Sequence, residues 1–252
     1  MYRLFFLLFF ALLFASCQHS EGAKNTHKYR SNSQSKQTQY TEQHQRSLDT
    51  NLLDIQALNP QIQIELKYTV SDNFLGEKLY AKITKAYLQH DVAQRLSGVQ
   101  EALEQAHPGY KLLIYDALRP VSVQQKMWVA LDSLPPIERV KFVSNPKNLS
   151  LHNMGAAVDL TIVNAKGIPL DMGAGFDDIR QIAYPIYEDS FLRAGALTLE
   201  QVANRKLLRS LMQSQGFRQL PTEWWHYNAC SRQEAKKKYK VYQTEAQIFQ
   251  NQ

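Results

Sequence analysis

A carboxylate stands inside an otherwise apolar segment of this chain, and it constrains both the fold and the chemistry. The segment Ala156 to Val163 reads AAVDLTIV and is rich in β-branched residues, so it predicts a central strand of a sheet. A carboxylate at Asp159 is costly in such a strand unless it is paired or bound to a metal ion. The segment therefore predicts a globular core with a polar site built into it.

Composition is consistent with such a core and excludes several other kinds of protein. Of the 252 residues, 44% are hydrophobic and 21% are charged, which is ordinary for a globular domain of this size. That balance excludes collagen-like, coiled-coil and wholly disordered chains. Only residues 1–16 form a long apolar run, which excludes a multi-span membrane protein, and 2 cysteines are too few for a disulfide scaffold or a multi-cysteine zinc site.

The N-terminus has the features of an export signal. Arg3 precedes an apolar stretch from Leu4 to Phe14, which is shorter than a transmembrane helix of about 20 residues and typical of a signal peptide. The residues FASC that end at Cys17 resemble a bacterial lipoprotein signal, in which the cysteine is acylated. We therefore expect residues 1–16 to be a signal peptide and Cys17 to carry lipid. The alternative is an ordinary secretory signal cut near Ser16.

A polar tether is predicted to follow the leader. Residues 17–50 are rich in Gln, Ser, Asn, Thr, His and Lys and have almost no aliphatic side chains, so they cannot bury enough surface to offset the entropy of ordering. We expect an exported, lipid-anchored protein of the periplasm. Gln18 gives no retention signal for the inner membrane, which by resemblance to lipoproteins of diderm bacteria favours the outer membrane. The folded domain is expected at residues 51–243, with a tail at 244–252.

Hydrophobic periodicity predicts a mixture of helices and strands in the folded part. Thr198 and Gln201 form a capping box at the start of one helix, and Gly216 suits its C-terminal cap. The order is mixed rather than strictly alternating, which favours an α+β fold over a doubly wound α/β fold. The predicted strands are residues 62–66, 110–115, 156–163 and 224–229, and the predicted helices are residues 87–106, 122–131 and the segment from Thr198.

Three polar clusters occur where the pattern predicts core. They are the segment from Ser150 to Asp159, the segment Glu223 to His226, and the charged loop Asp116 to Pro120. Two imidazoles and one carboxylate from the first two clusters fit a catalytic zinc ion, which takes three N or O ligands and keeps one place for water. The alternative is two core histidines with ordinary hydrogen bonds and a buried Asp–Arg pair.

The neighbours of these ligands suggest catalytic roles. Glu223 lies close to His226 in sequence, so it is the natural general base for a zinc-bound water and the later proton donor to the leaving amine. Arg119 could face the developing oxyanion. Residues three apart on an extended segment point to opposite faces, so a bulge or turn is needed if Glu223 and His226 are to enter one site.

The order of these motifs resembles that of one enzyme family. SLHNMGAAVD matches the Ser-x-His-x-x-Gly-x-Ala-x-Asp pattern of the zinc D-alanyl-D-alanine dipeptidases, the VanX-like branch of peptidase family M15, and EWWHY at 223–227 matches its second motif. Further pieces agree in order, and the resemblance spans about residues 66–227. They are Tyr68 with DNFLG at 72–76 and Tyr80, DALRP at 116–120, and Met172-Gly173 with Phe176-Asp177.

The resemblance implies a role for each matching residue. It implies one Zn²⁺ per chain, in a compact α+β domain with a central antiparallel sheet flanked by helices and the zinc at the sheet edge. Asp177 would pair with the free ammonium of a dipeptide. The implied zinc ligands are His152, Asp159 and His226, the catalytic residues are Glu223 and Arg119, and the substrate contacts are Ser150 and Asp177.

The expected function is hydrolysis of D-Ala-D-Ala to two D-Ala. The alternative is a D,D- or L,D-carboxypeptidase that trims peptidoglycan stem peptides, because an exported enzyme meets those polymers directly. A third possibility is an inactive cell-wall-binding module with structural zinc. The expected partners are a small peptide and, through the lipid, a membrane, with no nucleic acid. The basic run at 236–240 is interpreted as a solvated helix face, and Cys230 as a packing residue.

Overall fold

The computed structural model describes residues 52–249. The predicted signal peptide, Cys17 and the predicted tether lie outside the described residues, so the lipid anchor stays a prediction. Among residues 52–249 there is no helix with the length and apolar character needed to cross a membrane.

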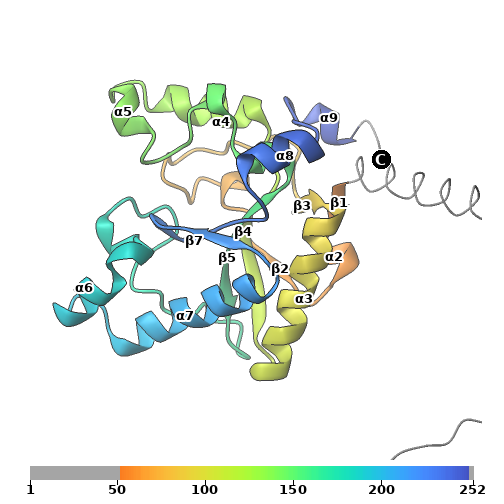
Figure 1. The fold of residues 1–252 in the computed structure, drawn as a ribbon. Coiled ribbons are helices and arrows are strands. Elements are labelled where there is room, and N and C mark those ends of the chain that lie inside the picture. The colour runs from red at the N-terminus through yellow and green to blue at the C-terminus, as the bar shows by residue number, and fades with distance from the viewer. Residues whose placement is uncertain (1–51, 250–252) are drawn as a thin grey trace, which may run out of the picture. The chain divides into compact units, whose positions relative to one another are not determined.

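A five-stranded sheet forms the centre of the described residues (Figure 1). Its strand order is β2-β4-β5-β7-β6, in which β2 and β4 are parallel and the other neighbours antiparallel. A separate antiparallel ribbon pairs β1 with β3. The strands are β1 (Leu52–Asp54), β2 (Gln63–Ile64), β3 (Tyr87–Gln89), β4 (Lys111–Asp116), β5 (Ala157–Val163), β6 (Arg218–Leu220) and β7 (Glu223–Asn228).

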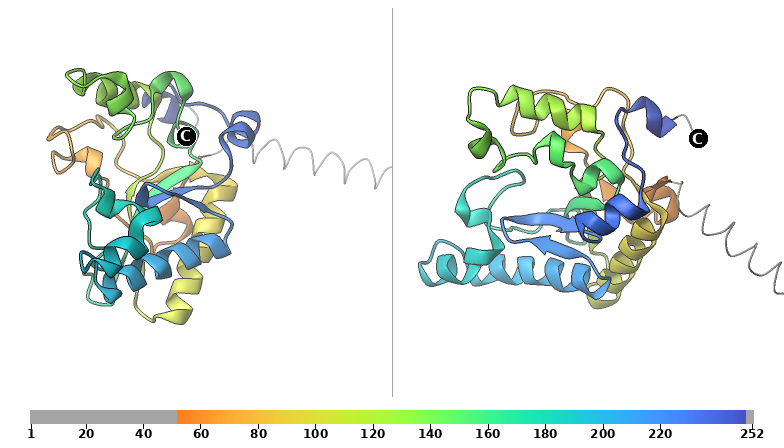
Figure 2. Two further views of the ribbon diagram at one scale, coloured as in Figure 1. Left: turned by 60° about the vertical axis from the view of Figure 1, so that its left-hand side comes forward. Right: turned by 45° about the horizontal axis from the view of Figure 1, so that its top comes forward.

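Helices flank this sheet on both sides (Figures 1 and 2). Helices α3 and α7 contact each other on one side, and α4, α5, α8 and α9 lie on the other. This arrangement confirms the predicted α+β class. The α-helices are α2 (Ile55–Leu58), α3 (His90–Ala106), α4 (Val121–Ala130), α5 (Pro136–Arg139), α6 (Glu188–Arg193), α7 (Leu199–Ser214), α8 (Arg232–Lys238) and α9 (Ala246–Phe249). The 3₁₀ turns are η1 (Lys67–Thr69), η2 (Pro146–Asn148), η3 (Leu151–Met154), η4 (Gln181–Ala183) and η5 (Pro185–Tyr187).

Strand β5 lies in the middle of the sheet, as its composition predicts. It pairs with β4 on one side and β7 on the other, and all seven of its residues are buried. Even the carboxylate-bearing residue Asp159 is only 3% exposed. A charge in that position has little access to water, so the protein itself must supply its partners.

The prediction of a helix at residues 87–106 was wrong at its first three residues. Tyr87 to Gln89 form β3, in which all three residues are buried against β1, and α3 begins only at His90. The rest of the segment is the amphipathic helix that was predicted, with Val92, Leu96 and Leu103 on its buried face. Pairing with a strand remote in sequence outweighs the local helical pattern.

The capping of α7 confirms a prediction made from local sequence. The Thr198 side chain accepts a hydrogen bond from the Gln201 N–H at 3.1 Å, and the Gln201 side chain accepts one from the Thr198 N–H at 2.9 Å. After the helix ends, Gly216 has a φ of 77°, which is the left-handed conformation that glycine adopts readily. Both signals lie within one turn of the helix ends.

The C-terminal segment of the described residues is hydrogen-bonded to η3 and to the start of α4. The Tyr242 N–H donates to the Asn153 carbonyl at 2.8 Å, and the Val121 N–H donates to the Tyr242 carbonyl at 3.0 Å. Farther along, the Glu245 carboxylate accepts three backbone N–H groups from residues 81–83 at 2.5–3.0 Å. The C-terminal segment is therefore part of the folded structure as far as residue 249.

The contacts of Glu245 predict a loss of stability when its carboxylate is removed. We expect Glu245→Ala to lower the free energy of unfolding by about 1–3 kcal/mol, because three N–H donors lose their acceptor. Urea denaturation followed by circular dichroism measures this. Glu77→Ala, which removes an exposed carboxylate, is the control and should change stability by less than about 0.5 kcal/mol. Equal effects of the two substitutions would contradict the assignment.

Candidate metal centre and active site

Three side chains from separate elements converge at one end of the sheet. His152 lies in η3, the turn that leads into β5, Asp159 lies on β5, and His226 lies on β7. Asp159 and His226 are direct partners in the register of the two strands. One ligand atom from each residue lies within 4.8 Å of the other two, and all three residues are buried. Of the three residues, Asp159 and His226 stand on interior strands of the sheet, β5 and β7.

The spacing of these atoms suits a tetrahedral metal ion. Nε2 of His152 lies 3.2 Å from Nδ1 of His226 and 3.3 Å from Oδ2 of Asp159. Nδ1 of His226 lies 2.9 Å from Oδ1 of Asp159. Ligand atoms about 2.0–2.2 Å from a tetrahedral zinc ion are roughly 3.4 Å from one another. Two imidazoles and one carboxylate at these separations therefore fit zinc with little movement.

Hydrogen bonds behind the cluster fix which imidazole nitrogens face it. Nδ1 of His152 lies 2.6 Å from the Ala117 carbonyl, which can only accept, so this nitrogen carries the hydrogen and leaves the Nε2 lone pair free. Nε2 of His226 likewise donates to the Asn228 side-chain oxygen at 3.0 Å, so Nδ1 is the nitrogen that faces the cluster and has the lone pair when the ring is neutral. Such outer partners orient metal ligands. Asn228 was missed in the sequence, although its position two residues after His226 on a strand places it on the same face.

The cluster is held together electrostatically. Burial alone would raise the pKa of Asp159, but the two neighbouring imidazoles hold that pKa well below its usual range. Burial would likewise lower the pKa of His226, but the Asp159 carboxylate, assisted by Glu223, raises it to about 9. A positive charge at this position is therefore favoured, whether it comes from a proton or from a metal ion.

A bulge brings Glu223 to the same site as His226. In the pairing of β6 with β7, Gln219 faces Tyr227 but Leu220 faces Glu223, so the register shifts between them. The extra residues on β7 turn the two side chains toward one side, and Oε2 of Glu223 lies 3.7 Å from Nδ1 of His226. This is the irregularity that the three-residue spacing required. Burial raises the pKa of Glu223, so its carboxylate is a stronger base than a solvated one.

Arg119 lies near the cluster and has a carboxylate partner of its own. Its Nη1 is 3.4 Å from Oδ2 of Asp116, and Oδ1 of Asp116 accepts the Tyr80 hydroxyl at 2.6 Å. The buried Asp–Arg pair considered from the sequence thus exists, but its acid is Asp116, whose Oδ2 also lies 3.7 Å from Nδ1 of His152. Asp159 instead contacts both histidines on the nitrogens that face the cluster. Burial opposes the charge on Arg119, yet Asp116 keeps its pKa above the ordinary value, so the guanidinium stays cationic.

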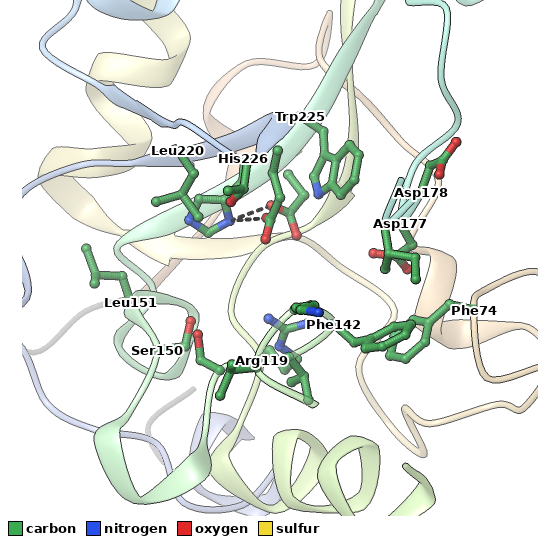
Figure 3. A pocket seen from close by; sticks show the side chains of 18 of the residues that line it. Phe74, Arg119, Phe142, Ser150, Leu151, Asp177, Asp178, Leu220, Trp225 and His226 are labelled. Carbon is green, nitrogen blue, oxygen red and sulfur yellow. Dashed lines mark hydrogen bonds and ion pairs between the residues drawn. The ribbon is translucent and has the colours of Figure 1, made fainter. Parts of the chain in front are cut away.

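One cavity gathers most of these side chains (Figure 3). It has a volume of about 110 Å³ and lies between the sheet and the loops that precede and follow β5. His152 is fully buried and is not among the residues that line the cavity. The predicted zinc-binding, catalytic and substrate-contacting residues that line the cavity are Arg119, Ser150, Asp159, Asp177, Glu223 and His226.

Asp177 presents a carboxylate with few partners to this cavity. It accepts the Tyr68 hydroxyl at 3.1 Å, and burial, reinforced by the negative charge of Asp159, raises its pKa well above the usual range. Its φ of 60° is left-handed, a conformation in which Asp is more common than most residues and which recurs at functional sites. A carboxyl group in this state gains most from a ligand that brings a positive charge.

The loop that carries Asp177 is fastened to α7 by a buried arginine. Nε of Arg205 donates to the Met172 carbonyl at 2.6 Å, and its Nη2 donates to the Ile182 carbonyl at 2.9 Å. These two carbonyls stand on either side of Asp177 in sequence. Arg205 therefore holds both ends of the loop and fixes where the carboxylate points.

The Ser150 hydroxyl can donate a hydrogen bond inside the cavity. Its Oγ accepts the His152 N–H at 3.3 Å, as the cap of η3, while its own N–H donates to the Asn153 side chain at 2.7 Å. The hydroxyl hydrogen of Ser150 is not needed for capping. It is available to an acceptor on a bound molecule.

The structure also shows the surroundings of Cys230 and of the basic run at 236–240. Burial raises the pKa of the half-buried Cys230 thiol, which disfavours a nucleophilic thiolate. The basic run on and after α8 is exposed, and Lys238 pairs with Asp91 at 2.7 Å. Both agree with the packing and solvated-face interpretations.

Comparisons with a family model and with known protein sequences all match D-Ala-D-Ala dipeptidases. The family model described as D-ala-D-ala dipeptidase, Peptidase_M15, matches residues 48–245. D-alanyl-D-alanine dipeptidase of Escherichia coli (strain K12) is 33% identical over 178 residues, which cover 71% of this chain and 84% of that protein. The enzyme of the same name from Enterococcus faecium is 28% identical over 180 residues, 66% of this chain and 85% of that protein.

A solved structure shows a weaker likeness. It is a variant of the vancomycin-resistance D,D-pentapeptidase VanY from a VanB-type cassette, in complex with Zn(II). The sequence identity is 14% and the TM-score 0.32, over 63% of this chain and 81% of that chain.

The raised pKa of His226 predicts how metal binding depends on pH. Below about pH 9 the metal-free protein holds a proton on His226 that a metal ion must displace, whereas Asp159 is already ionised. We expect the affinity for Zn²⁺ to rise roughly tenfold per pH unit up to that value and then to level off. Competition with a chelating dye, corrected for protonation of the dye, measures it. A plateau that begins near about pH 6.5, the ordinary histidine value, would contradict the assignment.

Proposed function

The chain belongs to the D-Ala-D-Ala dipeptidase family of M15 peptidases, and we propose that it is a zinc enzyme that hydrolyses D-alanyl-D-alanine to two molecules of D-Ala. One observation carries the proposal. The cluster of His152, Asp159 and His226 opens on a small cavity that also contains Glu223 and Arg119. The three metal-binding side chains alone would also suit a structural metal ion. Glu223 as a base and Arg119 as a cation beside them suit a hydrolytic site.

The three clustered side chains would hold one zinc ion. Two nitrogen ligands and one oxygen ligand leave a fourth place open, which is typical of catalytic rather than structural zinc. Zinc held there would supply Lewis acidity and lower the pKa of water to about 7. The hydrogen bonds that the two imidazoles donate to the Ala117 carbonyl and the Asn228 side-chain oxygen would keep both rings in the required tautomers.

Glu223 is the proposed proton carrier. Its side chain is 29% exposed and stands beside His226, so it can reach both a ligand of the cluster and a molecule in the cavity. It takes a proton from the attacking water and later gives that proton to the nitrogen of the departing amine. Its raised pKa suits the first transfer, because it makes the carboxylate a better acceptor for the proton of the water.

Arg119 is the proposed stabiliser of the tetrahedral intermediate. Negative charge develops on the carbonyl oxygen of the substrate as water adds, and a fixed cation favours that state over the ground state. The side chain is 8% exposed and is held by Asp116, so little reorganisation is needed when the charge appears. The Arg119 side chain also lines the cavity, so its guanidinium stands beside the space that a substrate would occupy.

Asp177 and Ser150 are the proposed substrate contacts. The Asp177 carboxyl group would ionise on meeting the free ammonium of a dipeptide, and the Ser150 hydroxyl would donate to an oxygen of the substrate. A longer peptide has an amide nitrogen in place of the ammonium, so it would leave a buried acid uncompensated. This difference favours free dipeptides over stem peptides.

A carboxypeptidase acting on peptidoglycan stem peptides is the second candidate. The signal-like leader ahead of Cys17 favours it, because export would bring the enzyme to the cell wall. Residence in the periplasm, with a lipid anchor in the outer membrane, remains part of the proposal. A non-catalytic wall-binding module is less consistent with the cavity, where such a module would have no need of Glu223 or Arg119.

A substrate panel tests the choice between the two enzymes. We expect release of D-Ala from free D-Ala-D-Ala and much slower release from N-acetylated D-Ala-D-Ala. Asp177→Asn should lower kcat/KM for the free dipeptide by at least about 30-fold, because a buried charge pair is lost. Asp189→Asn, which changes an exposed acid on α6 that does not line the cavity, is the matched control and should leave kcat/KM within a few-fold. Faster cleavage of the acylated peptide would favour the carboxypeptidase.

Removal of the base tests the role of Glu223. We expect Glu223→Ala to bind zinc with unchanged stoichiometry and to lose about three orders of magnitude or more in kcat, since the proton transfers lose their carrier. Metal analysis of the purified variant and release of D-Ala measure the two quantities separately. Turnover close to that of the unmodified protein would rule out this role.

A further inference from the structure

A second cavity lies next to the active-site cavity and shares one of its walls. It has a volume of about 370 Å³, against about 110 Å³ for the active-site cavity. Phe74, Asp177 and Asp178 line both, whereas Lys67 and Asp72 line only the second. The acid proposed to bind the substrate ammonium therefore stands at the boundary between the two spaces, and the side chain of Phe74 stands there with it.

Phe74 is stacked on a second aromatic ring at this boundary. Its ring lies 6.1 Å from that of Phe142, centroid to centroid, with an angle of 25° between the planes. Phe74 belongs to the segment after η1, and Phe142 to the segment after α5, so the pair joins two loops remote in sequence. Figure 3 shows the two rings side by side, on the side of the cavity where Asp177 lies.

The backbone around Phe74 is held firmly by its neighbour. The Asn73 side chain donates to the carbonyls of Val70 and Glu77, both at 2.8 Å, and accepts the Leu75 N–H at 3.0 Å. One amide thus ties together the turn that presents Phe74. The backbone that carries Phe74 is therefore ordered, and the ring itself packs against Phe142.

We propose that Phe74, supported by Phe142, determines the length of the substrate. The inference rests on the proposed dipeptidase function. If Asp177 binds the ammonium of a dipeptide, a residue added on the amino side must pass Asp177, and the stacked rings occupy that path. Beyond them lies the larger cavity, whose rim is polar because Lys67 and Asp72 pair there at 2.7 Å. That cavity is where the amino-terminal part of a longer peptide would lie if the wall were absent.

The wall and the charge restrict length in different ways. Asp177 disfavours a longer peptide because an amide nitrogen does not compensate its carboxylate, and this penalty remains whatever happens to Phe74. The rings disfavour it by filling space, and this penalty disappears when the ring is removed. Truncation of Phe74 should therefore raise activity on a longer peptide relative to the dipeptide without abolishing the preference for a free ammonium.

The experiment compares two peptides on variants of the full chain loaded with zinc. Release of D-Ala is measured from D-Ala-D-Ala and from L-Ala-D-Ala-D-Ala. We expect Phe74→Ala to raise the ratio of kcat/KM for the tripeptide over the dipeptide by at least about tenfold. Phe74→Leu, which keeps an apolar side chain without a ring, should give an intermediate ratio. Phe191→Ala, a ring removed from α6, is the matched control and should leave the ratio unchanged.

The outcomes separate this proposal from the one on which it rests. If the unmodified protein cleaves the dipeptide and Phe74→Ala leaves the ratio unchanged, the length-determining role is overturned and the dipeptidase function stands. The same holds if the unmodified protein cleaves both peptides equally well. An unmodified, zinc-loaded protein that cleaves neither peptide overturns both proposals. Zinc content and circular dichroism of Phe74→Ala establish that it is folded, and should that variant be unstable, Phe74→Leu decides by the same ratio.

Discussion

The burial of one carboxylate at the centre of the sheet sets the conditions for the rest of the structure. Asp159 stands on a strand with neighbours on both sides and is 3% exposed, so water cannot stabilise its charge. Two imidazoles do so instead, one from the turn before the strand and one from the strand beside it. Their outer nitrogens are in turn fixed by a carbonyl and an amide. Because these contacts already orient both imidazoles and the carboxylate, the site needs little rearrangement to bind a metal ion.

Three buried or half-buried acids near this site have different partners, and the partners separate their roles. Asp116 is paired with Arg119 and a tyrosine hydroxyl, which makes it a support for the cation. Asp159 is paired with two imidazoles and stays ionised. Asp177 has one tyrosine hydroxyl and a strongly raised pKa, so of the three it has the most to gain from an incoming positive charge. One type of side chain thus serves as support, metal ligand and substrate contact according to its surroundings.

Much of this could be predicted from local sequence, and the failures have a common cause. The apolar strand around Asp159 and the cap of α7 depend on residues a few positions apart, and both were predicted. The start of α3 was not, because Tyr87 to Gln89 pair with β1, which is remote in sequence. The predicted histidines and acids do lie together, but the role of Asn228 as a partner of His226 was missed. The need for a bulge beside Glu223 was foreseen, but its position on β6 and β7 was not.

The sequence by itself determined the chemical groups of the site and their order, since donor atoms and strand or helix patterns are properties of short segments. Only the tertiary structure decided that Arg119 pairs with Asp116, and that Asp159 contacts the nitrogens of both histidines that face the cluster. It also decided that Phe74 meets Phe142 beside Asp177. These contacts join segments that touch only after the chain has packed, and the free energy that selects them comes from burial of the whole core rather than from neighbouring residues.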